Sequence, residues 1–172
     1  LEKWRYIMNS CTKEELEDFK KAGKIACKAK LYGAKMIKPG IKMNEVLEAV
    51  DQKILELGGR FAFPAQISIN NCAAHFAPRK ENPIEFKEKD VVKIDVGVHI
   101  NGFVADNAVT VDLGYNPKLT KAAKDALDNA IKILKPVTQM CQIGAVIEKT
   151  ITDAGFEPIR NLSGHGIGKF II

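Results

Sequence analysis

The chain has 172 residues, enough for one domain that buries roughly 70% of the surface its unfolded form would expose. Its content of 46% apolar and 27% charged residues is ordinary for a globular protein. No apolar run approaches the length of a membrane span, and we therefore expect a cytoplasmic protein. The net charge is +5, and the 22 lysines among the 26 basic residues are spread along the chain, which is typical of a solvated surface. Such a surface permits contact with an anionic partner such as the ribosome. The sequence contains no specific nucleic-acid motif.

The two ends of the chain indicate that it is part of a longer protein. Residues 1–8, LEKWRYIM, are too charged and too short in apolar residues to be a signal peptide. The chain begins with Leu and stops in the apolar run KFII, with no turn, cap or polar tail after it. We expect a single incomplete domain over residues 1–172.

The four cysteines exclude some metal and redox sites. They are widely spaced and form no CxxC pair, which argues against a zinc ribbon or a redox motif. Free cysteine usually behaves as a small apolar residue, so we expect reduced and mostly buried thiols.

Secondary structure follows from caps, turns and apolar spacing. Thr12 and Glu15 form a capping box, which predicts the start of the first helix. Asn101-Gly102 predicts a two-residue hairpin turn, and prolines and glycines mark the remaining element ends. In chain order we expect helices over 13–37 and 44–57, a short strand over 66–70, hairpin strands over 90–100 and 103–113, helices over 118–134 and 142–153, and a strand over 159–163.

The second half of the chain repeats the first at an offset of 97 residues. Lys38-Pro39 corresponds to Lys135-Pro136, and Gly58 to Gly155, so both helix ends recur. Self-similarity over such a period indicates a duplicated structural unit. We therefore expect repeat one over about 13–113 and a truncated repeat two over about 117–172, with a second hairpin beyond residue 172.

The turn at Asn101-Gly102 also predicts the register of the hairpin. It pairs Gly97 with Asp106, so Asp95 and Asp106 lie on one face, about 7–8 Å apart at Cα, with Gly97 leaving a space beside them. Two carboxylates this close repel each other unless a cation lies between them. The alternative is a pair of surface aspartates on a strand face turned to solvent.

Three histidines are candidates to join the aspartates. His165 lies between glycines that let the backbone approach closely, and an Asp, Asp, His set suits Mn, Fe, Co or Zn. His75 occupies the matching place in the first repeat and suits acid–base work, metal binding or simple packing. His99 lies about 13 Å along the strand from Asp95, and we expect it to be structural.

The motifs around these residues resemble those of type II methionine aminopeptidases. The resemblance covers about residues 14–172 and is closer to the archaeal form, because no long charged extension precedes the domain. The spacings of Phe63, His75, Asp95 and Asp106 agree with the family. The matching motifs are Ala62-Phe63-Pro64, Ser68-Ile69-Asn70, Ala73-Ala74-His75, Lys93-Ile94-Asp95, Ala105-Asp106 and Asn161-Leu162-Ser163-Gly164-His165.

This resemblance implies an α+β pita-bread fold, a pseudo-twofold duplication around two divalent metal ions (Co, Mn, Fe or Zn). It implies that Asp95 binds one ion, Asp106 bridges both and His165 binds the other. His75 would contact the substrate and stabilise the tetrahedral intermediate. Phe63 and Ile172 would line the pocket for the methionine side chain. The implied reaction is hydrolytic removal of methionine from the N-termini of nascent proteins by a monomer.

One departure from the family and two rival functions stand beside this interpretation. The two glutamate ligands and a further histidine of the family come after the last residue of this chain, so we expect these 172 residues alone to be inactive. One rival is a non-enzymatic relative that binds RNA or protein partners, although such relatives lose the ligand at the position of Asp106. The other is an Xaa-Pro dipeptidase-like member of the fold, which would carry an extra N-terminal domain.

Overall fold

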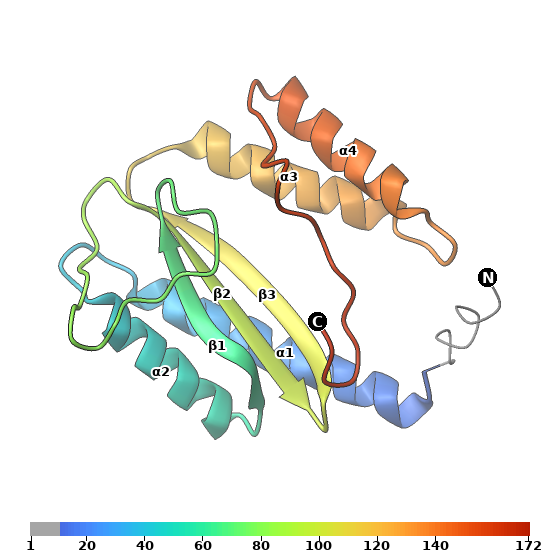
Figure 1. Ribbon diagram of the computed structural model, residues 1–172, viewed down its shortest axis with the longest axis horizontal. Helices are drawn as coiled ribbons and strands as arrows, with labels where there is room; N and C mark the ends of the chain where they lie inside the picture. Colours follow the sequence, from blue (N-terminus) through green and yellow to red (C-terminus); the bar gives the residue numbers. More distant parts are fainter. Residues whose placement is uncertain (1–10) are drawn as a thin grey trace.

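The computed structural model describes residues 11–172. The expectation for residues 1–8 lies outside this range. Four helices and three strands follow one another along the chain, as Figure 1 shows. They are α1 (Lys13–Met36), α2 (Met43–Glu56), β1 (Arg60–Ile69), β2 (Val91–Ile100), β3 (Phe103–Asp112), α3 (Pro117–Ile133) and α4 (Met140–Asp153).

The helix ends lie within two residues of the predicted positions. Thr12 caps α1, because its hydroxyl accepts from the Glu15 amide while the Glu15 carboxylate accepts from the Thr12 amide. Pro117 begins α3 at a position where its missing N–H is no loss. Helices α2 and α4 have identical bounds at the offset of 97 residues, and α1 and α3 end at the same offset. The duplication is therefore visible in the helices.

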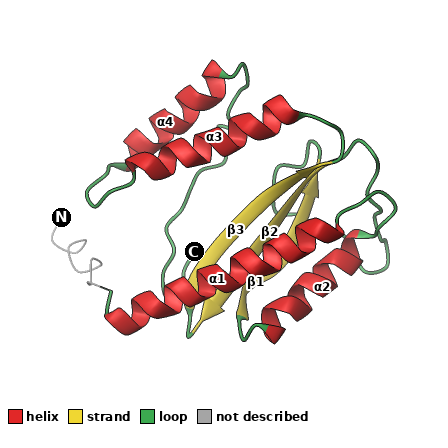
Figure 2. Ribbon diagram, turned by 180° about the vertical axis from the view of Figure 1, so that it is seen from behind, coloured by secondary structure: helices red, strands yellow, loops and turns green. Residues whose placement is uncertain are grey.

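The three strands form one antiparallel sheet in the order β1-β2-β3, and α1 and α2 cover one of its faces (Figure 2). The core lies between this face and the two helices, because alternate residues of β2 point into it. Gly33 lets α1 approach closely, since a Cβ there would lie 2.4 Å from Val50 of α2 and 2.6 Å from Ile94 of β2. The buried residues of β2 on this face are Val92, Ile94, Val96, Val98 and Ile100.

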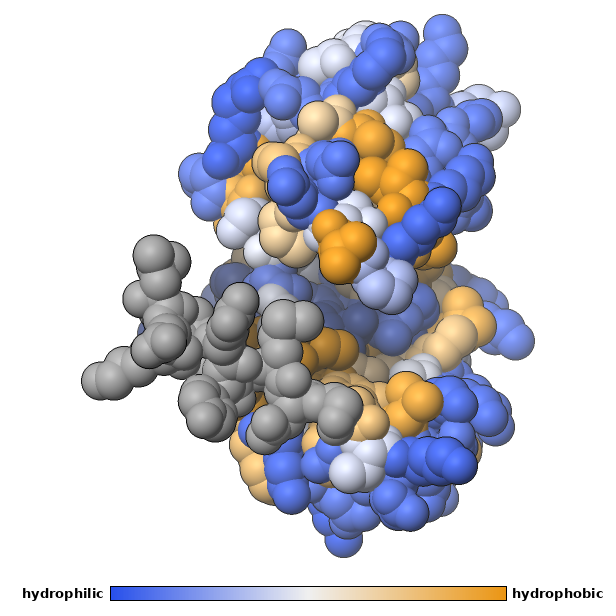
Figure 3. Space-filling view, turned by 90° about the vertical axis from the view of Figure 1, so that its right-hand side faces the viewer, coloured by the Kyte–Doolittle hydropathy of each residue, from blue (hydrophilic) through white to orange (hydrophobic). Residues whose placement is uncertain are grey.

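The remaining elements form a second layer. Helices α3 and α4 pack against each other, and the segment after α4 then crosses toward the open face of the sheet (Figure 1). This segment ends at the hairpin turn, where the Phe170 amide donates to the Gly102 carbonyl at 2.8 Å. In Figure 3 the surface is hollowed between the two layers. None of the helices in residues 11–172 is both long enough and apolar enough to cross a membrane.

Three expectations about the elements need correction. β1 is ten residues long instead of a short strand over 66–70, with irregular pairing on both sides of Phe63. Residues 159–163 form no strand, since they are exposed and have no neighbouring strand to pair with in the described chain. The thiols of Cys11, Cys27 and Cys141 are exposed, and that of Cys72 is only half-buried, so the expectation of buried thiols was wrong.

Candidate metal centre

The hairpin of β2 and β3 has the predicted register. Asn101 and Gly102 both have positive φ, 50° and 91°, as a type I′ turn requires. Gly97 pairs with Asp106, and Asp95 pairs with Ala108 on the same strand β3. The two aspartates therefore lie on one face of the sheet, the face opposite to the core and to helices α1 and α2.

The carboxylate of Asp95 is in an unfavourable environment for a negative charge. Burial raises its pKa, and the neighbouring carboxylate of Asp106 raises it further, to about 6. The charge of His75 acts in the opposite direction and lowers the pKa. The Oδ1 atom of Asp95 is buried and has no hydrogen-bond partner among the described residues. A cation beside this oxygen would satisfy it and would offset the repulsion between the two carboxylates.

His165 reaches Asp106 from the other repeat. Its Nε2 lies 3.3 Å from Oδ2 of Asp106, while its Nδ1 lies 3.1 Å from the carbonyl oxygen of Gly166. The extended segment that carries His165 is held to the hairpin just beyond it, where Lys169 bridges to Phe103. Asp106 is therefore a neighbour of both Asp95 and His165.

These contacts are pairwise, and they do not yet enclose an ion. In residues 11–172 the structure forms no group of three or more His, Cys, Asp or Glu side chains arranged to hold a metal ion. The donor types still fit one, because two carboxylates and an imidazole suit Mn, Fe, Co or Zn. The buried, unpartnered oxygen of Asp95 is the observation that favours a cation at this place.

The space beside Gly97 is not empty, which corrects the expectation. A Cβ at Gly97 would lie 2.3 Å from two ring carbons of Phe63. The Phe63 ring, carried by the irregular part of β1, therefore covers the glycine. Gly97 is needed for this close approach, and Phe63 lies directly beside the Asp95–Asp106 pair on the paired strands.

His75 lies in a pocket that residues from both repeats line. The pocket has a volume of about 390 Å³, and Asn161 and Leu162 contribute to it from the segment before His165. His75 has a φ of 59°, a left-handed backbone conformation that is uncommon for residues other than glycine. Backbone strain of this kind clusters at active sites and ligand-binding positions, which favours a functional role for His75.

Ile172 lines a different pocket, and Phe63 does not line it. This second pocket has a volume of about 200 Å³ and also contains His99 and Phe170. The His99 ring packs against the edge of Phe170 with centroids 5.3 Å apart, and its Nδ1 accepts from the Gly102 amide at 3.1 Å. Sequence reasoning missed Phe170 as a pocket residue, although its place two residues before Ile172 was a signal that could have been used.

Comparison with known proteins gives the family. The pattern of metallopeptidase family M24 matches residues 17–171. A methionine aminopeptidase from Archaeoglobus fulgidus is 52% identical over 154 residues, which are 90% of this chain and 53% of that protein. A methionine aminopeptidase from Methanothermus fervidus is 39% identical over 171 residues, and the match covers 91% of this chain and 91% of that protein. The chain spans about half the length of the relatives from Archaeoglobus fulgidus and Methanocaldococcus jannaschii.

Solved structures agree with the sequence relatives. The crystal structure of methionine aminopeptidase from Thermotoga maritima has a TM-score of 0.86 and 32% identity, over 92% of this chain and 68% of that one. Aminopeptidase P from Escherichia coli has a TM-score of 0.74 at 18% identity, over 83% of this chain and 34% of that one, and shows the fold alone. The α+β pita-bread fold is thereby confirmed, as is the resemblance on which it was based. The chain belongs to metallopeptidase family M24, with methionine aminopeptidases as its relatives.

Proposed function

We propose that the full-length protein containing this chain removes methionine from the N-termini of nascent polypeptides in a metal-dependent hydrolysis. The observation that carries the proposal is the buried, unpartnered Oδ1 of Asp95 beside Asp106 and His165. Unpaired buried charge is costly, so such an arrangement is kept where a cation offsets it. Family membership and the methionine aminopeptidases among the relatives support the same reaction.

Asp95, Asp106 and His165 are the proposed metal ligands. Asp106 would be the shared ligand, because its carboxylate contacts His165 and raises the pKa of Asp95. The Nε2 atom of His165 faces the aspartates, while its Nδ1 is directed to the Gly166 carbonyl, an arrangement that orients the ring of a ligating histidine. Divalent ions of Co, Mn, Fe or Zn at this place would act as Lewis acids and would lower the pKa of a bound water.

His75 is proposed to contact the substrate. Its charge is close enough to lower the pKa of Asp95, and its pocket receives residues of both repeats. From there the imidazole can donate a hydrogen bond to an oxygen on which negative charge develops. Phe63 and Ile172 remain the proposed apolar contacts for a methionine side chain; Phe63 lies at the carboxylates, and Ile172 lies at the neighbouring pocket with Phe170.

The partners and location follow from this reaction. Because its substrates would be the free N-termini of nascent chains, we propose that the protein acts in the cytoplasm near the ribosome. We propose that the full-length protein acts as a monomer. A polypeptide of these 172 residues alone should be inactive, because it carries three of the five metal ligands that the resemblance implies.

The test is methionine release from the peptide Met-Ala-Ser by the full-length protein, with Mn, Fe, Co or Zn added singly to metal-free protein. Asp106→Asn should abolish release and weaken binding of the divalent ion in calorimetry. Asp125→Asn on the exposed part of α3 is the matched control and should leave both unchanged. Cleavage of an Xaa-Pro peptide instead would favour the Xaa-Pro dipeptidase alternative, and failure to bind any divalent ion would favour the non-enzymatic relative.

A further inference from the structure

The positive charge of the chain is concentrated in one segment. Residues 19–42 contain eight lysines and no Asp or Glu. The remaining 18 basic residues are outnumbered by 21 acidic ones, so the rest of the chain has a net charge of −3. The expectation of evenly spread lysines therefore needs correction: the whole positive net charge comes from α1 and the turn that follows it.

Four of these lysines lie on the outer side of α1. Its other side, with buried Ala22, Ala26 and Ala29, packs on the sheet. Spacings of three, four and seven residues keep a set of lysines on one helix face, over a length of about 21 Å. We call this set the α1 lysine face; Figure 2 shows the outer side of α1 along which it runs. The α1 lysine face consists of Lys21, Lys24, Lys28 and Lys35, all of them exposed.

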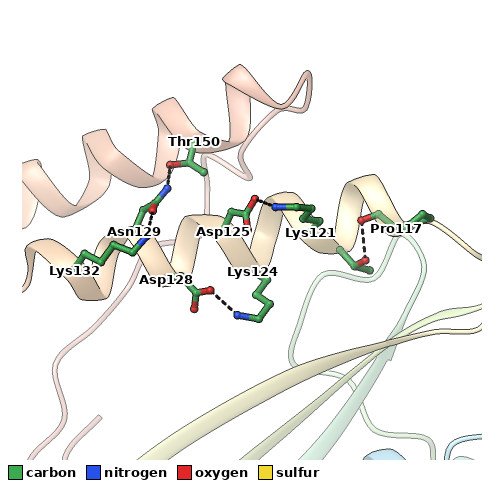
Figure 4. A network of polar contacts seen from close by, with 9 residues as sticks. Pro117, Lys121, Lys124, Asp125, Asp128, Asn129, Lys132 and Thr150 are labelled. Atoms are coloured by element: carbon green, nitrogen blue, oxygen red, sulfur yellow. Dashed lines mark hydrogen bonds and ion pairs between the residues drawn. The ribbon is translucent and has the colours of Figure 1, made fainter.

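The charges of the α1 lysine face have no ionic partner within 4 Å among residues 11–172. The ion pairs of the described chain include none of its four lysines. The lysines of α3 differ, as Figure 4 shows: Lys121 pairs with Asp125, and Lys124 pairs with Asp128. The four lysines of the α1 lysine face thus have no ion pair in the described chain, whereas two of the four lysines of α3 are held in ion pairs.

We propose that the α1 lysine face binds the sugar–phosphate backbone of RNA. Lysine ammonium groups bind phosphates as point charges, and a protein that neutralises several phosphates gains affinity by releasing counterions. The face contains no arginine for bidentate contacts to bases. Its exposed Tyr32 is covered by the ammonium group of Lys53, at 5.0 Å from the ring centroid. Binding should therefore depend on phosphate charge and not on base sequence.

The shape of the charged region favours a linear polyanion over a lipid surface. The lysines form a single row on a helix, and the neighbouring helix α2 exposes Glu45, Glu48 and Glu56. A flat anionic membrane would bring these carboxylates close to its own charge, whereas an RNA strand can follow the row alone. The negative remainder of the molecule would be repelled and would orient the protein with α1 toward the RNA.

The α1 lysine face and the carboxylate site lie on opposite sides of the sheet. Helix α1 covers the face formed by Ile94 and its neighbours, and Asp95 and Asp106 lie on the other. An RNA strand on α1 therefore leaves the peptidase site open. This inference does not depend on the proposed peptidase activity.

The test is binding of fluorescently labelled polyuridine RNA, followed by anisotropy over a salt series from about 50 to 200 mM. The test variant replaces Lys21, Lys24, Lys28 and Lys35 with Gln, which keeps helix propensity. The matched control replaces Lys118, Lys121, Lys124 and Lys132 of α3 with Gln and so removes the same charge. We expect at least a tenfold loss of affinity in the test variant and less than a twofold loss in the control.

The salt dependence gives a second measurement. Each phosphate contact on a single strand contributes about 0.7 to the slope of log affinity against log salt, so four lost contacts should reduce the slope by about 3. Equal losses in both variants would show a mere net-charge effect and would overturn the proposal. The absence of RNA binding by the unmodified protein would also overturn it, as would binding to phosphatidylserine vesicles without binding to RNA. Circular dichroism of both variants checks that α1 and α3 remain folded.

Discussion

The two repeats form the same helices but bury them differently. Helix α2 buries Met43, Val46, Val50 and Ile54, whereas α4, at the same bounds 97 residues later, has no buried residue. Helix α3 buries only three alanines. Apolar side chains are therefore left exposed on the α3–α4 layer, where Figure 3 shows orange patches. The exposed ones include Leu119, Leu127, Ile131, Leu134 and Met140.

This difference separates what the local sequence determines from what the sheet adds. Caps, prolines and glycines place the helix ends in both repeats, and they need no partner. Burial needs an apolar surface opposite the helix, and β1, β2 and β3 supply it only to α1 and α2. No strand in residues 11–172 covers α3 and α4 in the same way. Helix stability in the second repeat should therefore depend more on propensity and less on packing.

The largest expected effect compares the same residue type in the two repeats. Ile54 is 1% exposed in α2, and Ile151, its counterpart in α4, is half-buried. Ile54→Ala should lower the free energy of unfolding by about 2–5 kcal/mol, because it leaves a cavity between α2 and the sheet. Ile151→Ala should cost about 1 kcal/mol or less. Urea unfolding of both variants measures the difference, and equal costs would contradict the contrast in burial.

The next largest effect comes from two glycines, whose replacement with Ala should change the free energy of unfolding in opposite directions. Gly33→Ala in α1 should cost about 1–3 kcal/mol, because its Cβ would overlap Val50 and Ile94. Gly144→Ala in α4 meets no atom within 4 Å, and it should stabilise the helix by about 0.5–1 kcal/mol through its better helix propensity. Thermal unfolding checks both signs. Destabilisation by Gly144→Ala would mean that α4 is packed on that side after all.

The carboxylate pair adds a pH dependence to the first repeat. The pKa of Asp95 is about 6 in the fold against 3.8 for the free group, so the folded chain holds this proton more tightly than the unfolded chain. In the metal-free protein, the contribution of Asp95 to the free energy of unfolding should therefore be fully present below about pH 4. This contribution should be lost as the pH rises through about 6. Asp95→Asn should flatten the profile and raise the melting temperature at pH 7.

Asp106→Asn separates the two causes of the raised pKa. Burial of Asp95 would remain, but the neighbouring negative charge would be gone, so the profile should move toward lower pH without vanishing. Added divalent ion at pH 7 should restore stability to the unmodified protein and not to Asp95→Asn. A profile unchanged by Asp106→Asn would show that the two carboxylates do not interact.

How far the sequence predicted the site depends on the range of the interaction. The register of β2 and β3 followed from Asn101-Gly102 alone, because a two-residue turn leaves one pairing. The ring of Phe63 over Gly97 did not follow, since it depends on the irregular pairing of β1 around Pro64. The absence of a strand over 159–163 was missed for the same reason: strand formation requires a neighbour that periodicity cannot supply. The contact of His165 with Asp106 rests on how the last segment crosses the sheet.

The smallest expected effect is the cost of replacing the glycine that follows α2 or α4, and we expect this cost to be equal in the two repeats. Gly58 and Gly155 follow α2 and α4, and each has a φ of 82° with no atom within 4 Å of an added Cβ. Replacing either with Ala changes no packing and costs only the left-handed backbone strain, about 1 kcal/mol. Hydrogen exchange at the last turn of each helix measures the local cost. Since burial differs between α2 and α4 but backbone conformation does not, equal costs would assign the helix ends to local sequence, and a larger cost at Gly58 would show that the sheet also holds that end in place.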